Sequence, residues 1–232
     1  RTDNALVKAA EVVRRIAEYR PETRIHDTWR RFVEGMDFGP EMSDPFLEPE
    51  GFVEMCEALP MLGLARQAHA CTHTTIVPTV MRAGTKTNVI PDLVELELDI
   101  RTLPTQSGTE IKAMLAEALG DLADSVDMEI VSDDASSASP VDTPLWSAMQ
   151  RVATALHPGS TNVPAMTVGA TDARFFRRLG VPSYGFGLFS ERITFDDFNS
   201  MFHGDDERVD QDSLRLSTEL WLALAEDFVG GR

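Results

Sequence analysis

Two neighbouring stretches decide the fold: residues 74–83 read TTIVPTVMRA, and residues 93–102 read LVELELDIRT. The first is rich in β-branched residues, which favour strands. The second alternates apolar side chains with mostly acidic ones, so that one face would carry Val94, Leu96, Leu98 and Ile100. A turn containing Gly84 joins the two. The stretches therefore predict an antiparallel pair of strands with one buried face.

Helices are expected on both sides of this pair. Residues 3–19 repeat apolar positions at three- and four-residue steps, with Asp3 available as a cap. A second helix would begin after Ser107 and stop at Gly120, and residues 126–131 predict a further short strand. The order helix, strand, strand, helix, strand is that of a split βαβ layer without its first strand.

The stretch from 21 to 71 is irregular and predicts an insertion. Loops are expected around Gly39-Pro40, Asp44-Pro45 and Pro49, and a short helix within residues 51–64. A Ser/Asp/Ala-rich stretch from 132 to 140 predicts a domain crossing, so that the two domains would be residues 1–137 and 138–232. In the second domain we expect helices at 145–156, 172–179 and 213–228 and strands at 165–168 and 182–188, an α/β arrangement.

Composition excludes several classes. The chain has 232 residues, 43% of them hydrophobic, and a formal net charge of −17, which repels nucleic acids and anionic membranes. No apolar run reaches the ~20 residues of a membrane span. Cys56 and Cys71 are expected to be isolated thiols in a reducing, cytoplasmic setting. The chain opens without an initiator Met or a signal segment, so we expect it to come from within a longer polypeptide.

Five histidines are candidates for chemistry, and His203 has the most suggestive surroundings. It lies in Phe202-His203-Gly204-Asp205-Asp206-Glu207, a loop before a helix, where ligands are often presented. The alternative is a solvated acidic turn. His73, before the first strand, could line a cleft or be simply solvated. The other three, His26, His69 and His157, are expected to be structural.

Two further clusters could bind a carboxylate. Asn88, in the turn between the strands, offers a donor and an acceptor, and Arg101, at the end of the second strand, offers a bidentate fork. The alternative is an ordinary hairpin with a surface Arg. Residues 168–175 form a small-residue turn into a helix, where backbone amides can meet an anion. Its alternative is a routine capped helix.

Five segments, taken in order, resemble one family of enzymes. They are Asp3-Asn4-Ala5-Leu6, Gly84 to Asp92, Asp99-Ile100-Arg101, Gly169 to Ala173, and His203 to Glu207. The chain resembles the C-terminal two thirds of the co-catalytic zinc amidohydrolases and peptidases, the group of aminoacylase, acetylornithine deacetylase, succinyl-diaminopimelate desuccinylase, carnosinase-like dipeptidases and carboxypeptidase G. The resemblance implies a ferredoxin-like α+β lid that pairs to form a homodimer, followed by the C-terminal half of a helix-covered α/β catalytic domain.

The resemblance also implies residue roles. His203 would be a metal ligand, while Arg101 and Asn88 would hold the carboxylate and polar end of an N-acyl amino acid or short peptide. Gly169 and Thr171 would belong to a loop that closes on that carboxylate, with Arg174 as an outer partner. Two divalent metal ions, zinc or alternatively cobalt or manganese, would activate the water that cleaves the amide bond.

Other residues that such enzymes need are not matched in this sequence. The remaining metal ligands and the Glu general base would belong to an N-terminal half that is absent here. A catalytic zinc needs about three protein ligands, so we expect the chain to be inactive as it stands. The alternative is a non-enzymatic dimerisation or interaction protein. An oxidoreductase is disfavoured because no G-x-G-x-x-G follows a predicted strand.

Overall fold

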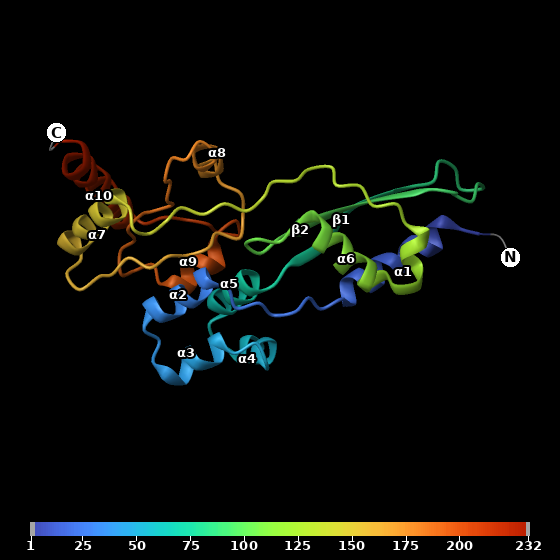
Figure 1. Cartoon of the computed structure of the whole chain (residues 1–232), viewed down its shortest axis with the longest axis horizontal. Coiled ribbons are helices and arrows are strands. Elements are labelled where there is room, and N and C mark those ends of the chain that lie inside the picture. Colours follow the sequence, from blue (N-terminus) through green and yellow to red (C-terminus); the bar gives the residue numbers. More distant parts are fainter. Residues whose placement is uncertain (1–2, 231–232) are drawn as a thin grey trace. The chain divides into compact units, whose positions relative to one another are not determined.

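The computed structural model describes residues 3–230 (Figure 1). Its contacts divide the chain into two compact units, Arg1–Glu22 with His73–Ser136, and Thr23–Thr72 with Ser137–Arg232. The first unit contains α1 (Ala5–Glu18), β1 (Thr75–Ala83), β2 (Val94–Arg101), α6 (Gly108–Leu119) and the 3-10 helix η1 (Gly120–Ser125). The second contains α2 (Asp27–Met36), α3 (Pro40–Leu47), α4 (Phe52–Ala58), α5 (Leu62–Thr72), α7 (Pro144–Leu156), α8 (Ala173–Arg178), α9 (Phe195–Met201) and α10 (Gln211–Val229).

The predicted strand pair is confirmed. β1 and β2 are antiparallel, with a register that runs from Thr75 opposite Arg101 to Ala83 opposite Val94. The register shifts between Pro78 and Val80. Proline has no amide hydrogen for the ladder, so an irregularity at this point is expected.

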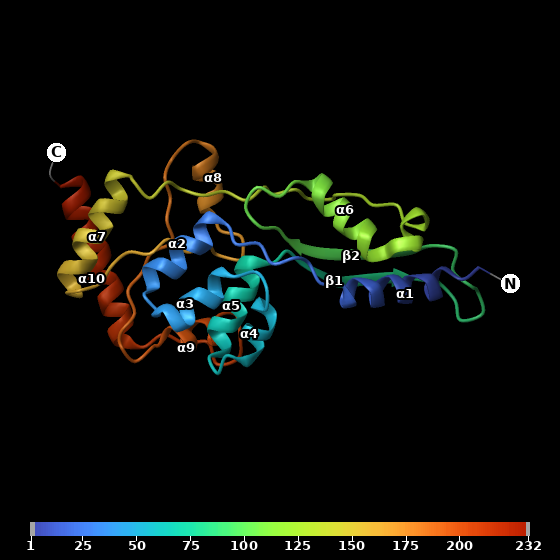
Figure 2. The same ribbon diagram turned by 60° about the horizontal axis from the view of Figure 1, so that its bottom comes forward.

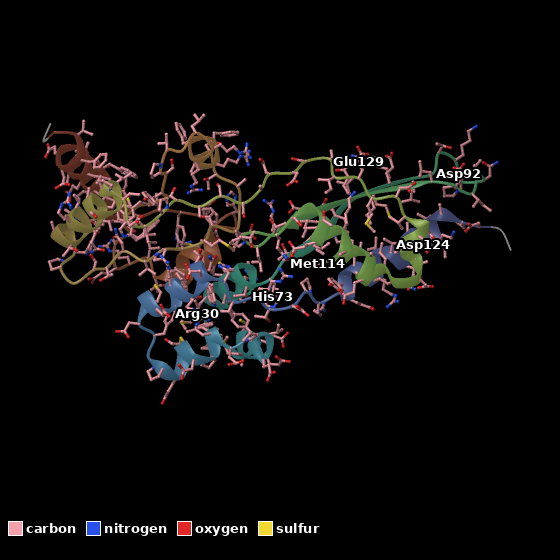
Figure 3. The ribbon with its side chains drawn as sticks, viewed as in Figure 1. Arg30, His73, Asp92, Met114, Asp124 and Glu129 are labelled. Atoms are coloured by element: carbon pink, nitrogen blue, oxygen red, sulfur yellow. The ribbon has the colours of Figure 1, made fainter. Side chains whose placement is uncertain are left out.

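The core of the first unit lies between this hairpin and two helices. One buried cluster contains Val12, Ile16, Ile111, Leu115 and Leu119, and the partly buried Ile76, Leu96, Leu98 and Ile100 pack against it. Met114, on α6, packs against the same cluster (Figure 3). The opposite face of the hairpin is open, and Val77 is 50% exposed. The alternation in β2 therefore places its apolar side chains as predicted.

Helix ends in this unit follow local sequence signals. The side chain of Asn4 accepts the Leu6 amide at 3.0 Å, so Asn4 rather than Asp3 caps α1. Ser107 and Glu110 form a capping box at the start of α6. The helix ends at Gly120, whose φ of 55° suits a residue without a Cβ.

Four helices occupy the stretch predicted as largely irregular. Figures 1 and 2 show α2 to α5 gathered beside α9. Their core is aromatic: the Trp29 indole stacks on Phe32 and donates to the carbonyl of Phe46 at 2.8 Å. The predicted loop around Gly39-Pro40 is confirmed as far as Gly39, and Pro40 begins α3, where its missing amide hydrogen costs nothing. The predicted loop at Asp44-Pro45 is wrong, because both residues lie inside α3. Residues 23–72 belong to the second unit by their contacts.

The helices predicted between 144 and 229 are confirmed as α7, α8 and α10. α7 and α10 lie side by side around Ala148, Met149, Val152, Leu220 and Leu224 (Figure 1). No helix among residues 3–230 is long and apolar enough to cross a membrane. The division of the chain into two functional domains at residue 137 stays a prediction.

Three predicted strands, at 126–131, 165–168 and 182–188, are wrong for the described residues. A strand requires a hydrogen-bonded neighbour, and within residues 3–230 only β1 and β2 pair. In the segments 165–168 and 182–188, side chains bind backbone carbonyls instead. Gln67 donates to the Met166 carbonyl at 3.0 Å, Arg177 to the Ser183 carbonyl at 2.7 Å, and Ser217 to the Leu188 carbonyl at 2.8 Å.

Candidate functional site

Asn88 and Arg101 lie at opposite ends of the hairpin. Asn88 is exposed in the turn that also contains Asp92 (Figure 3), and Arg101 is the last residue of β2. β2 has 8 residues, which at ~3.3 Å per residue span about 23 Å. A small substrate is shorter than this, so one copy of the chain does not bring the two side chains to the same substrate.

Arg101 is already engaged with a carboxylate on its own strand. Its Nε and Nη2 donate to Asp99 at 2.6 and 2.7 Å, a bidentate ion pair in which the Arg101 side chain is 51% exposed. A pair this exposed is weak and exchanges readily with water or another anion. The guanidinium therefore keeps Nη1 and a solvent-facing edge for a second carboxylate.

The turn before α8 brings Thr171 and Arg174 together. The Arg174 amide donates to the Thr171 carbonyl at 3.2 Å, and the Arg174 guanidinium lies 4.8 Å from the centre of the Phe175 ring. Gly169 and Thr171 are exposed, and α8 is only six residues long. The turn therefore displays small side chains and accessible backbone next to the Arg174 guanidinium.

His203 follows α9 on an exposed loop with a left-handed backbone, φ 56°. The Phe202 ring contacts the imidazole edge to face, with ring centres 4.3 Å apart. α9 itself is held by Asp196, whose Oδ1 accepts the amides of Gly63 at 2.6 Å and Leu64 at 3.2 Å. The approach is close: a Cβ on Gly63 would lie 2.6 Å from the Asp196 carbonyl oxygen. α5 thereby fixes the helix that leads into the His203 loop.

A second carboxylate fixes the chain after this loop. Asp210 caps α10 by accepting the Ser213 amide at 3.0 Å, and its Oδ2 accepts the hydroxyls of Ser213 at 2.6 Å and Ser190 at 3.0 Å. The Ser213 hydroxyl in turn accepts the Ser190 amide at 2.9 Å. These hydrogen bonds, the Ser213 hydroxyl first, lower the pKa of Asp210 to about 2. The network joins the segment before α9 to the start of α10.

The described residues do not by themselves fit a catalytic metal. His203 provides one imidazole, with Asp205, Asp206 and Glu207 close in sequence. Yet among residues 3–230 no three His, Cys, Asp or Glu side chains are grouped so that they could hold an ion. Because a catalytic zinc site takes about three protein ligands, His203 is at most one member of such a site.

The predicted site residues are divided between the two units. Asn88 and Arg101 belong to the first, and Gly169, Thr171, Arg174 and His203 to the second. His73 is buried rather than solvated, 2% exposed. The structural role predicted for His26 is confirmed: its Nδ1 accepts the Trp29 amide and its Nε2 donates to the Cys71 carbonyl.

Sequence reasoning missed an apolar pocket next to His203. Phe198, Met201 and Phe202 line it, together with residues before and after α9. The signal was available, because Phe195, Phe198 and Phe202 recur at three- and four-residue spacing, which predicts one face of a helix. Of this helix face, Phe198 and Phe202 line the pocket instead of being fully buried in the hydrophobic core.

The first unit is thus a two-stranded hairpin covered by two helices, and the second unit is largely helical and carries the exposed loop of His203. Residues 1–127 match the family described as the peptidase dimerisation domain, M20_dimer. That match covers more than half of the sequence, so the chain belongs to this peptidase dimerisation domain family.

The chain is similar to a curated protein in sequence and to a solved structure in fold. The chain is 26% identical over 169 residues to the N-fatty-acyl-amino acid synthase/hydrolase PM20D1 of Xenopus tropicalis, a match that covers 72% of this chain and 32% of the relative. Its fold is similar to that of the M20 family metallo-carboxypeptidase Sso-CP2 of Sulfolobus solfataricus, with a TM-score of 0.53 and 14% identity, covering 97% of this chain and 51% of that one. The chain thus spans about a third of the length of the curated relative and half of the solved structure.

Proposed function

We propose that this chain is the dimerisation lid and an adjoining part of a metal-dependent M20 hydrolase that cleaves the amide bond of an N-acyl amino acid or short peptide. The observation that carries the proposal is the match of residues 1–127 to the dimerisation family, a range that includes the hairpin and helices of the first unit and also residues 23–72. The names of both relatives support amide hydrolysis.

In this function Arg101 grips the substrate carboxylate and Asn88 binds a polar group of the substrate. Because about 23 Å of hairpin separates them, both reach one substrate only if they come from two copies of the chain. A homodimer supplies this arrangement, since a two-fold axis places residue 88 of each copy in the site that contains residue 101 of the other.

A complementation experiment tests both the hydrolase and the shared site. In the complete natural protein, Asn88→Ala and Arg101→Ala each lower kcat/KM on an N-acyl amino acid. When the two weakened variants are mixed and allowed to exchange subunits, half of the dimers are mixed and one site in each is intact, so the activity should rise to about a quarter of that of the wild type. If no activity returns although mixed dimers form, the two residues do not share a substrate between copies.

Arg82→Ala is the matched control for Arg101→Ala. Arg82 lies on the neighbouring strand and is paired with Glu97 across the hairpin, and its side chain is 60% exposed. Removing it deletes an exposed ion pair of the same kind without touching the end of β2. Its kcat/KM should equal that of the wild type, whereas Arg101→Ala should raise KM and lower kcat because a positioned carboxylate clamp is lost.

His203, Gly169, Thr171 and Arg174 take the roles that the family resemblance implies: one metal ligand, and a turn that closes on the substrate carboxylate. Since His203 is one ligand among several that a metal needs, the 232-residue chain alone should not hydrolyse amides and should bind less than one zinc ion per chain. Atomic absorption of the dialysed chain measures this. Dimers that form without any hydrolysis by the complete protein would instead favour a non-enzymatic pairing module.

A further inference from the structure

Asp99 holds Arg101 from two residues earlier in the same strand. Residues two apart in a strand project from the same face, which is here the open face of the hairpin. The Arg101 Nε and Nη2 donate to Asp99 Oδ1 and Oδ2 at 2.6 and 2.7 Å. Neither side chain has another hydrogen-bonded partner among residues 3–230. The pair is therefore a separate unit at the end of β2.

The register of the hairpin explains why this pair forms along the strand. Val77 lies opposite Asp99, so the carboxylate meets no cation directly across the ladder. The preceding acid on the same face, Glu97, pairs with Arg82 of β1. Asp99 is left with Arg101 as its cation, and the Arg101 side chain folds back along its own strand to meet it.

The pairing determines which edge of the guanidinium is available to a ligand. A guanidinium is planar and holds a carboxylate either on the edge of Nε and Nη2 or on the edge of Nη1 and Nη2. Asp99 occupies the first edge. The second edge keeps both N–H groups of Nη1 and one of Nη2. Since the Arg101 side chain is 51% exposed, a carboxylate from solution can bind this second edge without displacing Asp99.

Displacement of Asp99 by the ligand is the less favourable alternative. The carboxylate of Asp99 would then lack a cation, on a face where Glu97 adds a like charge two residues away. With Asp99 in place, a long and flexible side chain is already ordered before a ligand arrives, which lowers the entropic cost of binding in one geometry. The charge of Asp99 also opposes that of the incoming carboxylate, so the pair contributes orientation rather than attraction.

We propose that Asp99 is a positioning residue, which holds the Nε and Nη2 edge of Arg101 so that the substrate carboxylate binds the edge of Nη1 and Nη2. The inference rests on the function proposed above, in which Arg101 grips that carboxylate. It assigns a role to a side chain that does not itself contact the substrate.

The test measures kcat and KM separately in the complete natural protein, with the N-acetyl amino acid that it hydrolyses fastest in a panel. Asp99→Ala should lower kcat about tenfold, because a misplacement of only ~1 Å can cost about 100-fold. KM should change less than about threefold, because the lost orientation and the relieved repulsion oppose each other. Asp99→Asn should lie between Asp99→Ala and the wild type, since its amide oxygen still accepts a hydrogen bond.

Two comparisons show whether Asp99 acts through Arg101. On the C-terminal amide of the same compound, which has no carboxylate, Asp99→Ala should match the wild type. Combined with Arg101→Ala, it should cause no further loss, since the two residues then act as one unit. Glu97→Ala is the matched control, because Glu97 is an exposed acid on the same face that pairs with Arg82, and its kcat should equal that of the wild type.

The outcomes separate this inference from the proposed function. A lower KM with unchanged kcat would show that Asp99 competes with the substrate, and a loss that persists on the amide or adds to that of Arg101→Ala would show a merely structural role; either result overturns the inference. If Asp99→Ala equals the wild type while Arg101→Ala is impaired, the positioning role falls and the hydrolase stands. If the wild type hydrolyses no N-acetyl amino acid, the proposed function fails and this inference fails with it.

Discussion

Replacing Gly63 by alanine should destabilise the second unit, although alanine is normally the better helix former. Gly63 lies in α5, where a Cβ would be 2.6 Å from the backbone oxygen of Asp196, 2.8 Å from its Oδ1 and 3.0 Å from Asn199 Cβ. Non-bonded atoms prefer about 3.5–4.0 Å, so α5 and α9 would have to separate by about 1 Å.

The size of the effect follows from three contributions. Overpacking at a tight contact costs about 1–3 kcal/mol. Separation of the helices also weakens the hydrogen bonds from the Gly63 and Leu64 amides to Asp196, at about 1 kcal/mol in total. Alanine recovers about 0.5–1 kcal/mol of backbone entropy in a helix. We expect the free energy of unfolding to fall by about 1–3 kcal/mol.

Urea unfolding measures this loss. The three tryptophans, Trp29, Trp146 and Trp221, all belong to the second unit, so their fluorescence reports on it. Gly185→Ala is the control, because a Cβ at residue 185 meets no atom within 4 Å. If Gly63→Ala is as stable as Gly185→Ala, then α5 and α9 do not approach as described, and Asp196 does not hold the helix that leads to His203.

Three other predictions concern titration, thiols and substrate binding. The folded-state pKa of Asp210 is depressed, so its ionised form stabilises the fold above about pH 4, and this stabilisation is lost as the pH falls toward 2. Asp210→Asn should therefore have a lower thermal unfolding temperature than the wild type at pH 7, and the difference should be much smaller at pH 2. Burial raises the pKa of the Cys71 thiol to about 12 and also raises that of Cys56, so both should react with a thiol reagent only in urea; fast labelling of the native chain would contradict their burial. Arg101→Ala in the complete protein should lower kcat/KM at least tenfold, whereas an unchanged value would mean that its guanidinium binds no substrate carboxylate.

The first unit could be predicted from sequence because its signals are local. The alternation from Val94 to Ile100 determines which face of the strand is buried, and Ser107 with Glu110 marks a helix start over only four residues. The misassigned cap at Asp3 shows the limit of such reasoning. Asp3 and Asn4 are both good caps, and it is Asn4 whose side chain reaches the Leu6 amide, while Asp3 pairs with Lys8.

Of the helices between residues 27 and 72, α4 lies within the short helix expected in residues 51–64, whereas α2, α3 and most of α5 escaped prediction because distant contacts stabilise them. Pro45 lies inside α3 and glycines precede α3 and α4, which are local signals for loops. The hydrogen bond from Trp29 to the Phe46 carbonyl and the ring contacts of Trp29 with Phe46 and Phe52 favour helices instead. None of these pairings is visible in a short window of sequence. The three wrong strands failed for the converse reason, since an apolar segment is a strand only if another strand pairs with it.

The order of motifs identified candidate residues, but their presentation depends on anchors that no motif contains. His203 lies on a loop bounded by two carboxylates, Asp196 at the start of α9 and Asp210 at the start of α10. Asp196 accepts amides from α5, far away in the sequence, and Asp210 binds Ser190 across the loop. A side chain that binds a substrate or a metal must be positioned by rigid neighbouring structure and not only by the loop that carries it. The two carboxylates anchor both ends of the His203 loop. Substitution of either should therefore perturb this loop and the neighbouring pocket, although neither carboxylate lines the pocket.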